Sequence, residues 1–389
     1  MRDNPLARLR GFGQSVWCDD IGRELLQKGG LEVLIWRDGV CGLTSNPTIF
    51  FKAITGGSAY DAEIDRLAAA HAPTGEIMES LMFADIETAA DQLRPVYDLT
   101  GHRDGWVCVE VAPALANDTQ GTVTEAKRVR GLIDHPNVMV KVPGTTEGVA
   151  AIRDLVGLGY SINVTLIFSV ERHGEVIEAY LSGLEALEAR REAGEQVPAM
   201  ADVHGVASFF LSRIDTAVDR RLDALAGEAA AAGEQPGTLE AMRGKTAVAN
   251  AKAAYKLFQE RFSGPRWEAL CAKGANPQRP LWASTSTKDA RYSDILYVQE
   301  LIGPDTVNTM PLVTMEAYRN HGEPAETVTS EVAAALEHLQ SLERFGISMA
   351  EVTARLEADG VKTFFDSHEA LWAAIETKRD LKSGSAPDA

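Results

Sequence analysis

The stretch Val138-Met139-Val140-Lys141-Val142 decides the fold class of this chain. Side chains of a β-strand alternate between its two faces, so the three valines share one face while Met139 and Lys141 share the other. A face of β-branched residues suits the contact between a strand and the helices that cover it. Lys141 is therefore expected to point away from the helices, toward the interior that the strands enclose.

Seven further β-branched runs occur along the chain, each followed by a turn and a helical pattern, which is typical of parallel βα units. The eight runs are centred on Val16–Asp19, Gly42–Thr44, Val107–Val111, Val138–Val142, Ile162–Leu166, Val203–Ala207, Leu281–Ser284 and Thr306–Met310.

Eight such units predict a closed (β/α)₈ barrel, the TIM barrel. An open, doubly wound sheet is the alternative, and it would normally place a glycine-rich phosphate turn after its first strand. Neither Asp20–Arg23 nor the turn after Thr44 contains one.

The length and the 45% hydrophobic content suffice for one enlarged barrel, so we expect residues 1–389 to form a single domain. Residues 226–237, rich in Ala, Gly and Glu, predict a surface insertion. Residues 327–378 predict a helical C-terminal extension that lies over or beside the barrel mouth. The small polar residues 383–389 predict a disordered tail.

Local signals also predict individual helices. Ser45 and Asn46 followed by Pro47 make a favourable helix start. Apolar spacing predicts further helices over residues 209–225 and 239–262.

The net charge of −18 and the pI near 4.9 argue against nucleic-acid and anionic membrane partners, which require clustered cations. The N-terminal residues lack the apolar segment of a signal peptide, and no apolar run is long enough to span a membrane, so a cytoplasmic location is expected. The eight histidines show no HxH or HExxH spacing, and we expect neither a metal nor a cofactor. The sequence leaves a monomer and a homodimer open.

Polar residues recur on the inward face of the expected strands, namely Asp19, Glu110, Lys141, Asn163 and Thr165. All lie near the carboxyl ends of their strands, where barrel enzymes build their active sites. The alternative is a buried salt-bridge network that only neutralises the lysine, but such networks seldom stabilise a fold more than apolar packing does. The set therefore predicts an active site.

Chemistry for this site follows from the lysine. Burial in apolar surroundings favours the neutral form of an amine, which can attack a ketone to form a Schiff base. The resulting iminium is an electron sink that permits cleavage of a neighbouring C–C bond, while Asp19 and Glu110 are candidates for moving the protons.

Three motifs, Thr44–Pro47, Val140–Gly148 and Asn163–Ser169, resemble signatures of transaldolases and occur in the same order. The similarity runs from the first expected strand to the eighth, and the helix of residues 244–258 is similar to that of the longer bacterial subgroup. The resemblance implies a transferase of the class I, Schiff-base aldolase superfamily.

That resemblance implies roles for four catalytic residues. Lys141 forms the Schiff base, and Asp19 handles the proton of a substrate hydroxyl. Glu110 and Thr165 match the pair that holds a catalytic water.

It also implies five substrate-binding residues. Asn46 and Asn163 match asparagines that bind the hydroxyl groups of the donor sugar. Ser208, Arg213 and Ser284 match residues that receive the phosphate.

The sequence departs from the family pattern at several positions. Ala112 and Ala114 stand where many relatives carry Asp and Arg. An arginine that other branches place two residues after Ser284 is absent, and Lys288 is expected to replace it as a phosphate cation. Phe210 stands where related aldolases have a tyrosine, and its apolar ring cannot position a water for early release of the donor.

The implied reaction moves a dihydroxyacetone unit from sedoheptulose 7-phosphate or fructose 6-phosphate to glyceraldehyde 3-phosphate or erythrose 4-phosphate, in the non-oxidative pentose phosphate pathway. Two alternatives remain open at this point. One is a fructose 6-phosphate aldolase that uses the same lysine, and the other is a non-catalytic barrel that acts as a binding protein.

Overall fold

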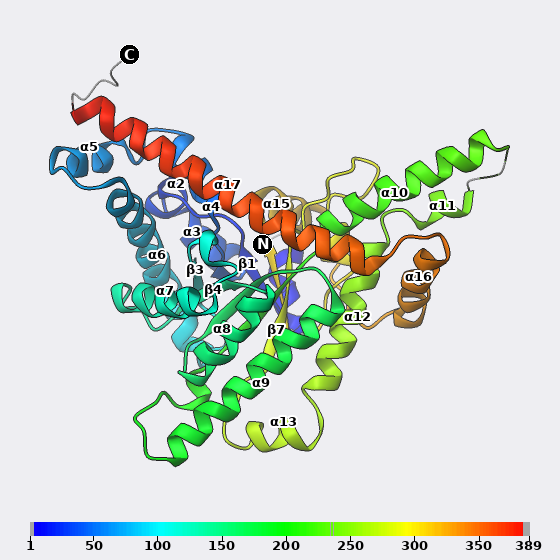
Figure 1. The fold of residues 1–389 in the computed structure, drawn as a ribbon, viewed down its shortest axis with the longest axis horizontal. Helices are drawn as coiled ribbons and strands as arrows, with labels where there is room; N and C mark the ends of the chain where they lie inside the picture. The colour runs from blue at the N-terminus through cyan, green and yellow to red at the C-terminus, as the bar shows by residue number, and fades with distance from the viewer. Residues whose placement is uncertain (1–3, 234, 236, 384–389) are drawn as a thin grey trace.

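The computed structural model describes residues 4–233, 235 and 237–383, and its centre is a closed barrel of eight parallel strands in sequential order, with β1 paired to β8 (Figure 1). The strands are β1 (Gln14–Cys18), β2 (Val40–Leu43), β3 (Trp106–Glu110), β4 (Val138–Pro143), β5 (Ile162–Ile167), β6 (Gly205–Phe210), β7 (Gln278–Ala283) and β8 (Thr306–Met310). The predicted barrel is confirmed, and the open sheet is excluded.

Helices surround the barrel, and further helices precede β1 and follow β8. Up to β5 they are α1 (Pro5–Arg8), η1 (Leu9–Phe12), α2 (Arg23–Gln27), α3 (Gly30–Val33), η2 (Leu34–Asp38), α4 (Pro47–Thr55), α5 (Asp61–Ala69), α6 (Thr74–Leu99), η3 (Pro113–Leu115), α7 (Thr119–Leu132) and α8 (Thr146–Gly157). After β5 they are α9 (Val170–Glu192), η4 (Met200–Asp202), α10 (Ser212–Ala231), α11 (Gly237–Met242), α12 (Thr246–Arg261), α13 (Gly264–Cys271), α14 (Leu296–Gln299), α15 (Leu312–His321), α16 (Val332–Arg344) and α17 (Met349–Ser383).

Side-chain caps set the starts of the helices that follow β2, β4 and β5. Asn46 accepts a hydrogen bond from the Ile49 N–H at 2.9 Å, and Pro47 occupies the first turn of α4, so this helix start is confirmed. Thr145 and Ser169 cap α8 and α9 in the same way. Each cap fixes the turn that links a barrel strand to its helix.

Two predicted helices have different bounds in the structure. The helix predicted over residues 209–225 was placed too early, because Phe209 and Phe210 are the last residues of β6. The helix predicted over residues 239–262 is two helices, α11 and α12. The break contains Gly244, whose φ of +66° is left-handed and whose missing Cβ leaves room for the ring of Tyr292.

Three segments outside the barrel were assigned from the sequence, and the structure describes them as follows. Helix α10 continues into the predicted insertion 226–237, of which residues 234 and 236 lie outside the described residues. In the C-terminal extension, residues 328–331 form a turn before α16. Of the predicted tail 383–389, only Ser383 is described, as the end of α17.

Helix α17 crosses the molecule as one long element, from α5 to α16 (Figure 1). It also contacts α4, α10 and β5, and the hydroxyls of Ser367 and Thr48 lie 2.8 Å apart. Gly360 permits this close passage, because a Cβ there would come within 2.9 Å of the Leu166 side chain. The C-terminal extension thus contributes side chains to the carboxyl-terminal mouth of the barrel.

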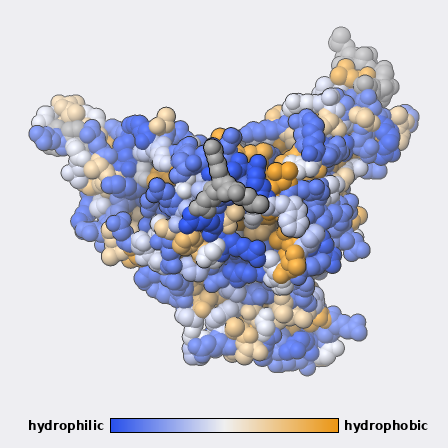
Figure 2. Space-filling model, turned by 180° about the vertical axis from the view of Figure 1, so that it is seen from behind, coloured by the Kyte–Doolittle hydropathy of each residue, from blue (hydrophilic) through white to orange (hydrophobic). Residues whose placement is uncertain are grey.

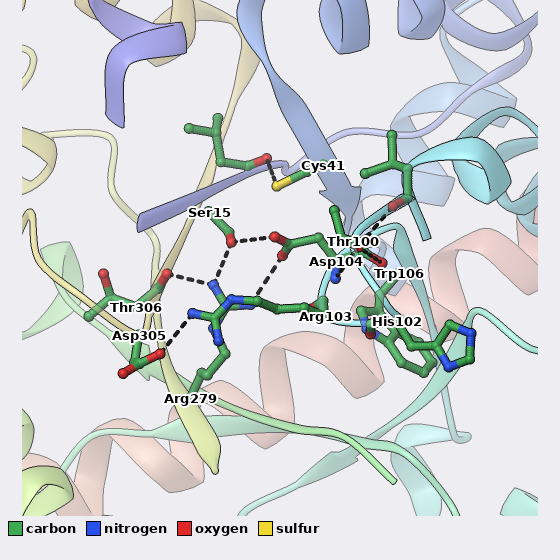
Figure 3. A network of polar contacts seen from close by, with 12 residues as sticks. Ser15, Cys41, Thr100, His102, Arg103, Asp104, Trp106, Arg279, Asp305 and Thr306 are labelled. Atoms are coloured by element: carbon green, nitrogen blue, oxygen red, sulfur yellow. Dashed lines mark hydrogen bonds and ion pairs between the residues drawn. The ribbon is translucent and has the colours of Figure 1, made fainter. Parts of the chain in front are cut away.

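The opposite end of the barrel is closed by a buried polar network around Arg279 (Figure 3). Its guanidinium donates to Asp104 at 3.1 Å, to the Thr306 carbonyl at 2.9 Å and to the Ser15 hydroxyl. Burial alone would raise the pKa of Asp104, but Arg279 and Ser15 outweigh it and hold that pKa below its usual range. The network joins β1, β7 and β8 to the residues that precede β3.

The outer surface is largely hydrophilic on the face opposite to that of Figure 1 (Figure 2). Among the residues that the structure describes, no helix combines the length and the apolar character needed to cross a membrane.

Removal of the charge on Asp104 should destabilise the barrel, because it leaves the Arg279 cation buried without its counterion. We expect Asp104→Asn to lower the free energy of unfolding by about 3 kcal/mol, measured by urea titration. Arg103→Gln removes a neighbouring but exposed ion pair with Asp305 and should change it by less than about 1 kcal/mol. Equal effects of the two variants would contradict the structural role assigned to the buried pair.

Candidate active site

A cavity of about 580 Å³ opens at the carboxyl ends of the strands. Nine of the eleven site residues expected from the sequence line it, namely Asp19, Asn46, Lys141, Thr165, Ser208, Phe210, Arg213, Ser284 and Lys288. The other two, Glu110 and Asn163, do not line it but contact residues that do. The structure thus brings the expected residues together at one end of the barrel.

Lys141 lies in β4 with only 4% of its surface exposed. Its Nζ donates to the Ser45 carbonyl at 3.0 Å and lies 3.2 Å from Oε2 of Glu110. The ring of Phe364, from α17, lies 5.5 Å from the same nitrogen. The amine is therefore held between the carboxylate of Glu110 and the aromatic ring of Phe364.

Glu110 is the last residue of β3 and pairs in register with Lys141. Burial raises the pKa of this carboxyl, and the positive charge of Lys141 offsets only part of that effect. A carboxylate in this environment accepts a proton more readily than one in water does.

Asp19 follows directly after β1 and is positioned by Thr44, the residue after β2, whose hydroxyl donates to its carboxylate at 2.9 Å. Burial raises the pKa of Asp19, while Lys141, Thr44 and Lys288 act in the opposite direction. Asp19 faces the cavity, so this second desolvated acid is accessible to a ligand.

Thr165 and Asn163 come from β5. The Oγ1 of Thr165 is buried and has no hydrogen-bond partner among the described residues. Asn163 donates to Sγ of Cys108 at 3.2 Å and accepts from the Ser208 hydroxyl at 2.7 Å. After Thr165 the strand register shifts at Leu166, whose φ of +61° is left-handed, and this irregularity re-aims the end of β5.

Asn46 can serve both as the cap of α4 and as a donor to a ligand. Its Oδ1 caps α4, which leaves the amide NH₂ group as the part of the side chain that can donate to a ligand. This geometry is compatible with binding of a sugar hydroxyl.

Besides Lys141, three cations line the cavity, namely Lys52, Arg213 and Lys288, and none of these three forms an ion pair with another residue of the described part of the chain. Burial lowers the pKa of Arg213, whose guanidinium lies 5.4 Å from the Phe210 ring. Burial also lowers the pKa of Lys288, and the charges of Lys52 and Arg213 add to this effect. Such unpaired cations in a protein of net charge −18 favour an anionic ligand.

Ser284 follows β7 with a left-handed φ of +57°. Its hydroxyl lies 2.8 Å from that of Ser212, and its carbonyl accepts the Ser212 N–H at 3.2 Å. The end of β7 is thus joined to the start of α10, which carries Arg213.

Several residues of this cavity were not predicted from the sequence. Lys52 lies one turn after Thr48 on the face of α4 that lines the cavity, so the helical spacing after Asn46 was a usable signal. Thr363 and Phe364 come from α17, more than 200 residues after Lys141, and no local pattern indicates which face of that helix meets the barrel.

In the part of the chain that the structure describes, no group of three or more His, Cys, Asp or Glu side chains is placed to hold a metal ion.

Comparison with known proteins gives consistent matches over almost the whole chain. The family model for transaldolase/fructose-6-phosphate aldolase matches residues 16–375. A protein named transaldolase from Thermobifida fusca is 47% identical over 369 residues, which cover 95% of this chain and 96% of the relative.

Two further relatives show similar agreement. Transaldolase 1 of Streptomyces avermitilis is 46% identical, with 96% of this chain and 95% of the relative covered. Transaldolase 2 of a Nostoc species is 43% identical, with 98% and 100% covered. This chain belongs to the transaldolase/fructose-6-phosphate aldolase family.

Proposed function

We propose that this chain is a transaldolase, which transfers a dihydroxyacetone unit from a ketose phosphate to an aldose phosphate through a Schiff base on Lys141. The observation that carries the proposal is the buried amine of Lys141, in contact with Glu110 beside a cavity that contains Asp19 and three cations without an ion-pair partner among the described residues. Family membership and the names of the relatives support the same activity.

Schiff-base formation begins with a proton transfer from Lys141 to Glu110, whose raised pKa makes it a ready acceptor. The neutral amine then attacks the ketone carbon of the donor. Glu110 returns a proton to the departing hydroxyl, so water leaves as the C=N bond forms and the positive charge rests on the iminium. The Phe364 ring beside Nζ is placed to stabilise this cation.

Cleavage requires a base at the next hydroxyl. Asp19 takes the proton of the C4 hydroxyl, the C3–C4 bond breaks, and its electron pair moves into the iminium to give an enamine. An aldose phosphate leaves and a second one enters. C3 of the enamine attacks its aldehyde, and Asp19 returns the proton to the new hydroxyl.

Release reverses the first step, since water adds to the iminium and the C–N bond breaks. Glu110 and the free hydroxyl of Thr165 hold this water in the proposal. Both groups are desolvated, so few other partners compete for it.

Binding of the substrate follows the distribution of charge. The phosphate is received by Arg213, Lys288, Ser284 and Ser208, and Lys52 adds a third cation to the same cavity. Asn46 binds a donor hydroxyl, and Asn163 acts on the donor through Ser208, which lines the cavity and donates to its amide oxygen. Sedoheptulose 7-phosphate or fructose 6-phosphate as donor, with glyceraldehyde 3-phosphate or erythrose 4-phosphate as acceptor, fits a cytoplasmic enzyme of the pentose phosphate pathway.

Borohydride reduction in the presence of fructose 6-phosphate should trap a sugar on Lys141, identified by peptide mass mapping. Lys141→Arg keeps the charge but cannot form a stable Schiff base, and we expect it to lose the adduct and at least about 10³-fold in kcat. Lys127→Arg, which changes an exposed lysine outside the cavity, should retain both. An adduct on another residue, or none in the native protein, would refute the mechanism.

Asp19→Asn should lower kcat by roughly 10²–10³-fold, because it removes the base for the C4 hydroxyl. Asp19 works deprotonated, so activity should fall as the pH drops through its pKa. Since burial raises that pKa, the loss should begin at a higher pH than an exposed aspartate would give. If the acidic limb of the kcat profile persists in Asp19→Asn, the base is another residue.

Product analysis with and without erythrose 4-phosphate separates a transferase from an aldolase. The native protein should release little dihydroxyacetone without an acceptor, because Phe210 offers no hydroxyl to position a water. Phe210→Tyr should raise acceptor-independent release by at least about tenfold. Abundant free dihydroxyacetone from the native protein would favour the aldolase instead.

A further inference from the structure

The segment between β7 and α14, residues 284–295, contains no helix or strand, yet it supplies two residues of the cavity. Ser284 is fixed by Ser212 at the start of this β7–α14 loop, but Lys288 lies four residues further along. A flexible loop would place this cation poorly, so the contacts that hold its far end determine how well a ligand meets it.

The first of these contacts is made by Tyr292. Its hydroxyl donates to Oδ2 of Asp219 at 2.6 Å, and Oδ1 of Asp219 accepts the Gly244 N–H at 3.0 Å. The Tyr292 ring packs directly on Gly244, where a Cβ would come within 2.7 Å of it. One buried carboxylate therefore joins the loop to the corner before α12.

The second contact has the same arrangement and lies one turn earlier on α10. Tyr297, in α14, donates to Oδ2 of Asp215 at 2.9 Å, and Oδ1 of Asp215 accepts the Ala247 N–H at 2.8 Å. Asp215 and Asp219 lie four residues apart on α10, so they share one face, and they are 2% and 6% exposed.

Helix α10 links these contacts to the cavity. Its first residues are Ser212, which binds Ser284, and Arg213, which lines the cavity. Helix α10 carries Arg213 and contacts both ends of the β7–α14 loop, which carries Lys288.

We infer that Asp219–Tyr292 and Asp215–Tyr297 form a tyrosine clamp that positions Lys288 opposite Arg213 for the phosphate end of the substrate. The inference deepens the proposed function, because it assigns positioning residues to the phosphate site of that reaction. None of the four clamp residues touches the reacting carbons, so their loss should weaken phosphate binding and spare the chemical step.

Tyr292 is the sharper position to test, since it lies four residues from Lys288 and Tyr297 lies nine away. Tyr292→Phe keeps the ring on Gly244 and removes the hydroxyl, which donates to Asp219 and also interacts with Arg243. Tyr180→Phe is the matched control, because this buried tyrosine donates to the Asn276 carbonyl away from the loop.

The experiment measures binding of inorganic phosphate by calorimetry and the KM and kcat for fructose 6-phosphate. We expect Tyr292→Phe to weaken phosphate binding and raise KM by about fivefold, with kcat changed less than about twofold. Tyr180→Phe should leave both constants unchanged, and thermal unfolding of both variants shows whether a loss of stability explains any difference.

Unchanged phosphate affinity in Tyr292→Phe, or an equal loss in Tyr180→Phe, would overturn the clamp. Weaker phosphate binding in Tyr292→Phe alone would support it even if the native protein failed to turn over fructose 6-phosphate. In that case the proposed reaction would be wrong while the clamp stood.

Discussion

The contact between Lys141 and Glu110 inside the barrel is the interaction on which the proposed chemistry depends. Two groups that would each be charged in water lie 3.2 Å apart with almost no solvent contact. Burial raises the pKa of the acid, which reduces the free-energy difference between the ion pair and the neutral pair. The barrel thereby holds an amine that can give up its proton without transfer to bulk water.

The rest of the fold supports this pair. The register of β3 and β4 places the two residues side by side, and the turn after β2 offers the Ser45 carbonyl to the same amine. Helix α17 brings Phe364 from the far end of the chain. At the opposite end of the barrel, Arg279 and Asp104 form a second buried pair. Neither residue lines the cavity, and the pair joins β7 to the residues before β3.

Strand periodicity was sufficient to predict the barrel and the convergence of Asp19, Glu110 and Lys141, because inward polar residues stand out against β-branched neighbours. Features that depend on distant contacts were not predictable. The break at Gly244 reflects the packing of Tyr292 from another segment, and the contribution of Phe364 depends on how α17 docks. The left-handed backbone at Leu166 likewise has no signal in a sequence that reads as a regular strand.

The coupling of the central pair can be measured directly by following the carboxyl carbon of Glu110 in a ¹³C-labelled protein by NMR as the pH is changed. From this coupling we expect Glu110 to titrate above the usual range of glutamate, and higher still in Lys141→Met, because removal of the cation leaves burial unopposed. A Glu110 that titrates in the usual range, or at the same pH in both proteins, would contradict it.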